Sequence, residues 1–135
     1  MQKKKPFSGK ITSFEKACAC LGISTRLPGV SRLPERFRAR AIADYKLCVI
    51  TEAVNKQMCN GWEPDYTDAS QWKYTPYFVV EKDKKSPAGV GFSHSTCDRW
   101  VTGSLVGSRL CLGSSDAVHF VNKHFKKIQI DHQLV

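Results

Sequence analysis

Histidine and cysteine side chains are the residues of this sequence that could bind a metal. His94 and Cys97 are three positions apart, and Cys111 lies on the next expected strand. Imidazole and thiolate groups are the usual ligands of zinc, so these three side chains could hold a zinc ion. Zinc sites, however, usually show paired C-x-x-C spacing, which this sequence lacks. We therefore expect ordinary thiols at these positions, and neither a metal nor a cofactor.

A cysteine nucleophile would need a histidine within reach and an acid to orient that histidine. The combinations that can be drawn use Cys97, Cys111, His94, His119, Asp98 and Asp116. Any chain with six cysteines and four histidines allows such combinations, and no family signature of a cysteine enzyme accompanies them. We expect no catalytic residues and a protein that is not an enzyme.

Composition indicates one domain with a basic surface. The chain has 135 residues, of which 41% are hydrophobic, and this is enough to bury a core. The net charge is +9, and eleven of the 21 basic residues lie among the first 46 positions. Such a charge favours phosphate groups, anionic membrane surfaces or acidic proteins as partners, and it carries no information about the fold.

The basic residues near the N-terminus could bind nucleic acid. Lys3, Lys4, Lys5 and Lys10 could form an arm that neutralises phosphates, and Arg36 and Arg40 lie one helical turn apart. The alternative is a solvated tail followed by an exposed helix face. Residues 1–10 are expected to be a flexible basic arm in either case.

Aromatic residues in the middle of the chain could instead bind a protein. Trp62, Tyr66, Trp72 and Tyr74 are flanked by acids, whereas aromatic platforms for nucleic acid need basic surroundings. Tryptophan and tyrosine are favoured at the centres of protein interfaces, so these side chains are either interface anchors or lids over the core.

The segment GSRLCLG adds a second candidate surface. In an extended strand, Arg109 would project to the face opposite Leu110 and Leu112, and Arg99 or Trp100 could lie beside it. An open sheet face that carries arginine and tryptophan is a reasonable interaction surface. The alternative, that Arg109 forms a salt bridge with a neighbouring acid, fits equally well.

Three segments have helical patterns. A T-x-x-E capping box at Thr12 precedes a short helix that Gly22 should end. Pro34 should open a long helix that extends to Lys56 or Cys59, with a stripe of Phe37, Ala41, Tyr45 and Cys48 followed by an almost wholly apolar second half. A final helix, capped by residues 114–116, should place Val118, Val121, Phe125 and Ile128 in the core.

Strand patterns lie between the second and third helices. Residues 77–80 and 90–94 should form two strands joined by the hairpin 82–89, residues 99–105 a weaker strand, and residues 105–112 the last strand. The predicted fold is therefore α+β, with one domain over residues 11–135. We expect a three- or four-stranded antiparallel sheet, with the long helix and the C-terminal helix packed on one face and the short N-terminal helix at its edge.

Features of targeting and redox state point to a reducing compartment. No apolar run approaches the roughly 18 residues that cross a membrane. Glu15 and Lys16 interrupt the stretch that would form the core of a signal peptide. Cys18 and Cys48 fall on apolar stripes of expected helices, where a free thiol behaves as a small hydrophobic group. We expect no disulfides and no membrane partner.

Several motifs resemble small uncharacterised proteins that tailed bacteriophages and prophages of gut bacteria encode. The motifs are LPxVSxLPExxR, GWEPD with KYTPYF, and VGSRLC before the final helix. The resemblance brings no catalytic or binding residues. It implies a phage context, with a virion component, a host-takeover factor or a replication accessory as candidate roles.

The leading functional hypothesis is a non-enzymatic phage protein that binds a virion or host protein through the aromatic loop and the open sheet face. The alternative is a nucleic-acid-binding accessory that uses the basic arm and the helix arginines. The expected location is the cytoplasm of the infected bacterium, and incorporation into the virion is also open. The sequence does not indicate an oligomeric state.

Overall fold

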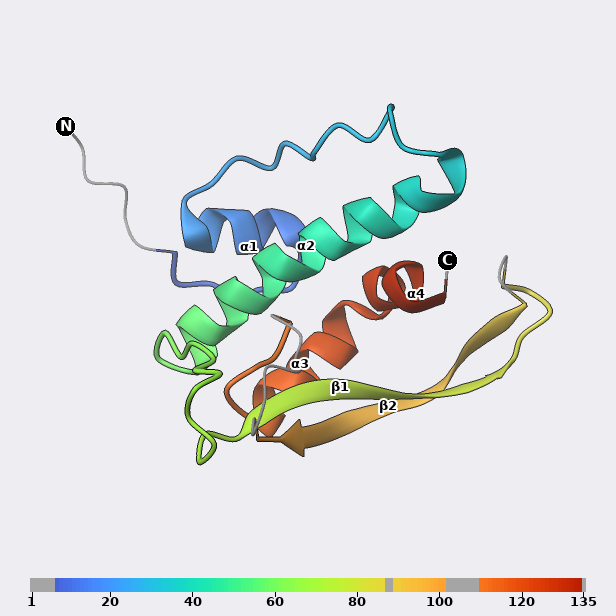
Figure 1. Ribbon diagram of the computed structural model, residues 1–135. Coiled ribbons are helices and arrows are strands. Elements are labelled where there is room, and N and C mark those ends of the chain that lie inside the picture. The colour runs from blue at the N-terminus through green and yellow to red at the C-terminus, as the bar shows by residue number, and fades with distance from the viewer. Residues whose placement is uncertain (1–6, 87–88, 102–109, 135) are drawn as a thin grey trace.

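The computed structural model describes residues 7–86, 89–101 and 110–134, and these form an α+β structure (Figure 1). The class predicted from the sequence is confirmed. The elements in chain order are α1 (Phe14–Leu21), α2 (Glu35–Met58), β1 (Lys73–Lys82), β2 (Val90–Trp100), α3 (Ser115–His124) and α4 (Lys126–Leu134).

The first two helices begin and end near the expected residues. Ser13, one position after the expected Thr12, caps α1, because its side chain accepts a hydrogen bond from the Lys16 amide at 3.2 Å. Gly22 ends α1 in the left-handed region, with φ of 68°, which glycine adopts without strain. Pro34 precedes α2, and Glu35 in the first turn lies beside the positive end of the helix dipole.

The expected C-terminal helix is two helices. Ser114 caps α3 by accepting a hydrogen bond from the Ala117 amide. Phe125 then leaves the helical conformation, with φ of −126° and ψ of 24°, and its side chain is buried in the core. The chain bends at this anchor, and α4 continues in a new direction. Val118 and Val121 are buried as predicted, and Ile128 packs against the core.

The sheet has two strands among the described residues, so the prediction of three or four strands is wrong. β1 and β2 pair antiparallel from Lys73–Trp100 to Lys82–Val90, with an irregularity at Val79/Val80. The expected strand at residues 99–105 begins inside β2, and its later part lies outside the described residues, as do residues 105–109 of the expected last strand.

Among the described residues, the expected last strand forms one isolated β-bridge with β1. Leu112 and Tyr74 exchange two backbone hydrogen bonds of 3.0 and 2.8 Å. A regular antiparallel ladder would next use the backbone groups of residue 114, because those of Cys111 and Gly113 point away from β1. The Asn55 side chain donates to the Cys111 carbonyl at 3.1 Å and accepts from the Gly113 amide at 3.0 Å. Ser114 caps α3 instead, and so the ladder cannot extend on that side.

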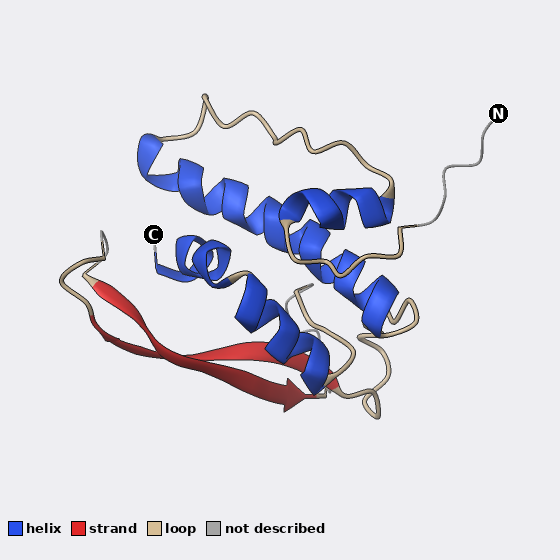
Figure 2. Cartoon of the chain, turned by 180° about the vertical axis from the view of Figure 1, so that it is seen from behind, coloured by secondary structure: helices blue, strands red, loops and turns tan. Residues whose placement is uncertain are grey.

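The helices form layers on one side of the hairpin (Figures 1 and 2). α3 contacts both strands and α4 contacts β2, whereas α2 packs against α1, α3 and α4. The expectation that the long helix lies directly on the sheet is therefore wrong. The C-terminal helices lie between α2 and the hairpin (Figures 1 and 2).

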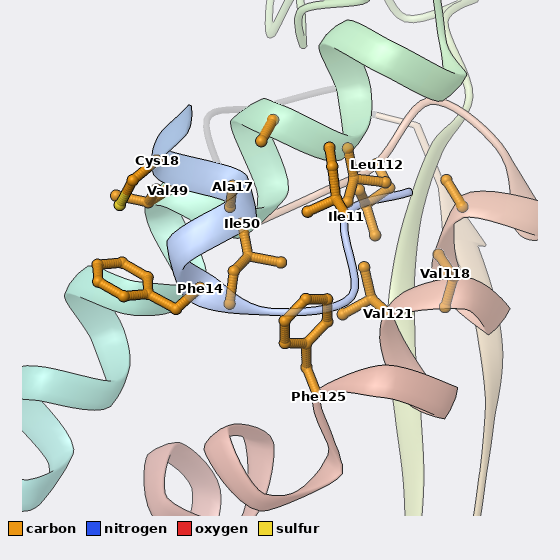
Figure 3. Packing of buried hydrophobic residues seen from close by; sticks show 13 residues of the cluster. Ile11, Phe14, Ala17, Cys18, Val49, Ile50, Leu112, Val118, Val121 and Phe125 are labelled. Carbon is orange, nitrogen blue, oxygen red and sulfur yellow. The ribbon is translucent and has the colours of Figure 1, made fainter. Parts of the chain in front are cut away.

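The core lies where α1, the second half of α2 and α3 meet (Figure 3). Its members come from three segments that are distant in sequence, residues 11–18, 49–54 and 112–125, and all are buried. They are Ile11, Phe14, Ala17, Cys18, Val49, Ile50, Ala53, Val54, Leu112, Ala117, Val118, Val121 and Phe125. The predicted apolar second half of α2 is confirmed by Val49, Ile50 and Val54.

The first half of α2 differs from its prediction. Phe37 is 48% exposed and Cys48 is also exposed, so the expected stripe does not form a buried face. The segment before α2 also leaves Leu27 and Leu33 partly open to solvent. Before α1, Phe7 packs against the core, and the Gln57 side chain donates to the Gly9 carbonyl at 2.6 Å. The described end of the basic arm thus contacts the domain.

Candidate functional site

Lys73 is the most unusual side chain of the structure, because it is a fully buried lysine, with 0% exposure. Its ammonium donates to the carbonyls of Gln71 and Asp68 at 3.2 and 3.5 Å. It also lies 5.9 Å from the ring centres of Tyr66 and Trp100. These contacts compensate part of the cost of removing a charge from water. Lys73 therefore fastens the loop before β1 to the end of the hairpin.

The loop between α2 and β1 is closed on itself by side chains. The side-chain oxygen of Gln71 accepts a hydrogen bond from the backbone N–H of Asp65 at 2.7 Å. The side-chain nitrogen of Gln71 donates to the backbone carbonyl of Glu63 at 3.0 Å. Asp65 accepts from the hydroxyl and the amide of Thr67, and Asp68 accepts in the same way from Ser70. The acids that flank the aromatic residues are thus turn-forming groups.

These hydrogen bonds hold the pKa of Asp65 and Asp68 below its ordinary value, and the positive charge of Lys73 adds to the effect. A carboxyl group whose pKa is lower in the folded state stabilises the fold at pH values above its pKa in the unfolded state. This contribution is lost as the pH falls through its pKa in the folded state. The turns should therefore weaken below about pH 4.

We expect tryptophan fluorescence of the wild type to change in this acid range before the helical circular dichroism does, because Trp62 and Trp72 flank the turns. A variant carrying D65N and D68N retains the acceptor oxygens and cannot titrate. Its fluorescence should be steady over the same range. The same acid change in both proteins would contradict the assignment.

Cys111 lies beside the Lys73 site and is buried. Burial raises the pKa of its thiol, while a hydrogen bond with Tyr66 and the charge of Lys73 act in the opposite direction. Burial also raises the pKa of Cys18, Cys48 and Cys97. Raised values leave these thiols protonated at neutral pH, which is unlike a reactive cysteine.

The structure does not bring the possible zinc ligands together. His94 and Cys97 are three residues apart on β2, so they lie on opposite faces of the strand. Cys97 packs against the core cluster, whereas His94 is exposed. Within residues 7–86, 89–101 and 110–134, no group of three histidine, cysteine or acidic side chains could hold a metal. All six cysteines are free thiols.

The predicted aromatic residues have different environments. Tyr66 and Trp100 are half-buried around Lys73, and Tyr74 is half-buried where it pairs with Leu112. Trp62 is half-buried against Gly113, where an added Cβ would lie only 2.8 Å from its ring. These four aromatic side chains therefore pack within the protein, which favours the lid interpretation for Trp62, Tyr66 and Tyr74.

Trp72 is the exception, with 44% of its surface exposed. The Arg99 guanidinium lies 4.3 Å from the centre of its ring, and Arg99 is exposed too. Next to this pair is an open groove of about 520 Å³ between the end of β2 and the start of α3. Thr96, Asp98 and His119 contribute polar groups to the groove.

The predicted basic residues lie away from this pair. Arg36 and Arg40 are exposed on the first turns of α2, and Arg36 lies 4.6 Å from the ring centre of Phe37. Neither arginine forms a salt bridge with any part of the chain that the structure describes. Lys10 is exposed. Lys3, Lys4, Lys5 and Arg109 lie outside the described residues.

Sequence reasoning missed Lys73 as a member of these sites, and it named Arg99 on the open sheet face without linking it to Trp72. Lysine is rarely buried, so composition alone places Lys73 on the surface. The useful signal was the aromatic residue on either side of it, Trp72 and Tyr74. Arg99 could be linked to Trp72 only through the strand register, which pairs Arg99 with Tyr74.

Every helix in the described ranges is too short or too polar to cross a membrane. Comparisons with protein-family models, curated proteins and solved structures give no match for this chain.

Proposed function

We propose that this chain is a non-enzymatic, phage-encoded protein-interaction module whose contact surface centres on Trp72 and Arg99. The observation that carries the proposal is the exposed stack of these two side chains beside an open polar groove. Tryptophan and arginine are the residue types most often found at binding hot spots. Because the stack already holds both side chains, binding would cost little side-chain entropy.

The phage context is part of the proposal and is supported by the LPxVSxLPExxR, GWEPD, KYTPYF and VGSRLC motifs. The protein would act in the cytoplasm of the infected bacterium or be incorporated into the virion. Its partner would be a virion or host protein. A partner surface with acidic groups fits best, because the chain carries a net charge of +9 and Arg99 offers an exposed guanidinium.

A second candidate function is nucleic-acid binding. It is favoured by the exposed Arg36 and Arg40, which have no acidic partner among the described residues. Neutralised phosphates would give an affinity that falls steeply with salt. Arg36 and Arg40 lie on α2, away from the Trp72–Arg99 pair, so variants can separate the two functions.

The experiment is a pull-down from infected cells, with and without nuclease, read by mass spectrometry and by recovery of nucleic acid. We expect defined protein partners that survive nuclease. The variant W72A should weaken their binding by at least about 30-fold, which corresponds to the loss of a hot spot. Y77A is the matched control, because Tyr77 is a 53% exposed aromatic residue of the same hairpin.

Two results would contradict the leading proposal. One is equal loss of binding in W72A and Y77A. The other is loss of all partners on nuclease treatment, with nucleic acid recovered beforehand and lost in a variant carrying R36A and R40A. The second result would establish the nucleic-acid function instead.

A further inference from the structure

The segment that joins α1 to α2 and the first turn of α2 form an open surface, residues 22–37, which we call the linker surface. Every residue in it is exposed except Val30, which is half-buried. Large apolar side chains with 39–48% of their surface exposed belong to it, namely Ile23, Leu27, Leu33 and Phe37. Exposed apolar side chains that lie so close together are typical of a binding surface.

An arginine directly precedes three of these apolar residues, because a short repeat, TRLP at 25–28 and SRLP at 31–34, is followed by ERF at 35–37. The pairs are Arg26–Leu27, Arg32–Leu33 and Arg36–Phe37. All three arginines are exposed, and none forms a salt bridge with a described residue. Glu35 is the only acid in residues 22–37. The linker surface therefore carries positive charge and apolar side chains at the same places.

Arg38, in the next turn of α2, holds the linker surface in one conformation. Its guanidinium donates to the backbone carbonyls of Leu33 and Ser31, both at 3.0 Å. The Leu33 amide donates to the Val30 carbonyl at 3.0 Å and closes a turn. Pro34 restricts the backbone at the start of α2. Because the segment is already ordered, binding would cost little backbone entropy.

The linker surface lies at the outer edge of the molecule, on the far side of α2 from the hairpin (Figures 1 and 2). It is the blue to cyan trace along the top of Figure 1. Trp72 and Arg99 belong to the hairpin and the loop before it, so the linker surface is separate from the proposed protein-binding surface. A surface at such an edge can meet a flat partner without a clash with the rest of the domain.

The mixture of charge and apolar groups decides between the possible anionic partners. The phosphates of a nucleic acid would neutralise the arginines but would not bury Leu27 and Leu33. A protein interface has an apolar centre from which charged residues are depleted, whereas here an arginine adjoins each central apolar side chain. A bilayer accepts both groups at one place. Apolar side chains enter the boundary between headgroups and acyl chains, and the guanidinium groups stay at the phosphates.

We propose that the linker surface docks the protein on the face of an anionic phospholipid bilayer. Its apolar side chains would lie in the boundary between headgroups and acyl chains, and its arginines would bind lipid phosphates. Surface docking needs no spanning run, so the lack of such a run, on which the expectation of no membrane partner was based, does not bear on it.

The test measures binding of the full chain to vesicles by co-sedimentation. Vesicles of phosphatidylglycerol mixed with phosphatidylcholine are compared with vesicles of phosphatidylcholine alone. One arginine at an anionic surface contributes about fivefold to the affinity, so we expect the three arginines to favour the anionic vesicles by about 100-fold. Salt should weaken this binding, because the charges are exposed.

Two variants remove the two kinds of group separately. The variant carrying L27S and L33S should bind anionic vesicles at least about tenfold more weakly, because less apolar surface is buried. The variant carrying R26Q, R32Q and R36Q should lose about 100-fold. All five side chains are exposed, so both variants should keep the circular dichroism spectrum of the wild type.

Two further variants are controls. K82Q, K84Q and K85Q together remove the same charge from exposed positions at the far end of the hairpin, and should cost less than about fivefold. W72A should bind vesicles as the wild type does, so failure of the protein-binding proposal and failure of lipid docking are distinguishable.

The docking proposal is overturned if the wild type does not bind anionic vesicles, or if the lysine control loses as much affinity as the arginine variant. It is also overturned if the L27S and L33S variant binds vesicles like the wild type. The arginines would then act alone, and retained binding of an oligonucleotide by that variant would assign them to nucleic acid. Vesicle binding that is unchanged in both variants, with loss of a protein partner from the pull-down, would make the linker surface a protein interface instead.

Discussion

Replacing Lys73 with alanine is expected to lower the free energy of unfolding by about 3–4 kcal/mol, measured by urea denaturation. The side chain is fully buried, and its ammonium donates to the carbonyls of Gln71 and Asp68. Alanine removes these hydrogen bonds and also the contacts of the ammonium with Tyr66 and Trp100. It further leaves a space where the four-carbon stem was packed.

Methionine at the same position separates the contribution of the apolar stem to stability from the contribution of the charged ammonium. It fills nearly the same space as lysine but donates no hydrogen bond. We expect K73M to be about 1–2 kcal/mol less stable than the wild type, because two carbonyls lose their donor. Lys82 is the matched control, since it lies exposed at the other end of β1. K82A should change stability by less than about 0.5 kcal/mol. A K73A variant as stable as K82A would refute the role of Lys73.

The helices could largely be predicted from sequence because their ends depend on nearby residues. The start and end of α1 and the start of α2 are set by residues within one helical turn, namely Ser13 or Thr12, Gly22 and Pro34. The apolar second half of α2 indicates which part of that helix lies in the core. The break at Phe125 could not be predicted in this way. Its residues continue a helical pattern, and only burial of the Phe125 side chain against distant elements bends the chain.

The sheet and the candidate site depend on contacts between distant residues. The expected last strand has the composition of a strand, yet Ser114 caps α3 two residues after Leu112 and ends the pairing on that side. Similarly, the aromatic residues near position 70 look alike in sequence. Their exposures differ because Tyr66 and Trp100 pack around the buried ammonium of Lys73, whereas Trp72 stacks on Arg99 at the surface.

Replacing Asn55 with alanine is expected to cost about 3 kcal/mol of unfolding free energy. Asn55 is 5% exposed and joins α2 to the segment before α3 through the Cys111 carbonyl and the Gly113 amide. Alanine leaves one buried acceptor and one donor without partners, and each such loss is costly. E52A, at an exposed position of the same helix, is the control and should change stability by less than about 0.5 kcal/mol.

Aspartate at position 55 tests whether the two hydrogen bonds have the directions described. As a carboxylate it can accept from the Gly113 amide, but it cannot donate to the Cys111 carbonyl, so N55D should be as unstable as N55A near neutral pH. Burial raises the pKa of such a carboxyl above its unfolded value, and the protonated acid regains a donor. The stabilising contribution of this carboxyl group is then present at pH values below its pKa in the unfolded state. It is lost as the pH rises through its pKa in the folded state. The deficit of N55D relative to the wild type at the same pH should therefore shrink towards about pH 4, whereas that of N55A should not. Parallel pH profiles for the two variants would show that donation to the Cys111 carbonyl does not stabilise the fold.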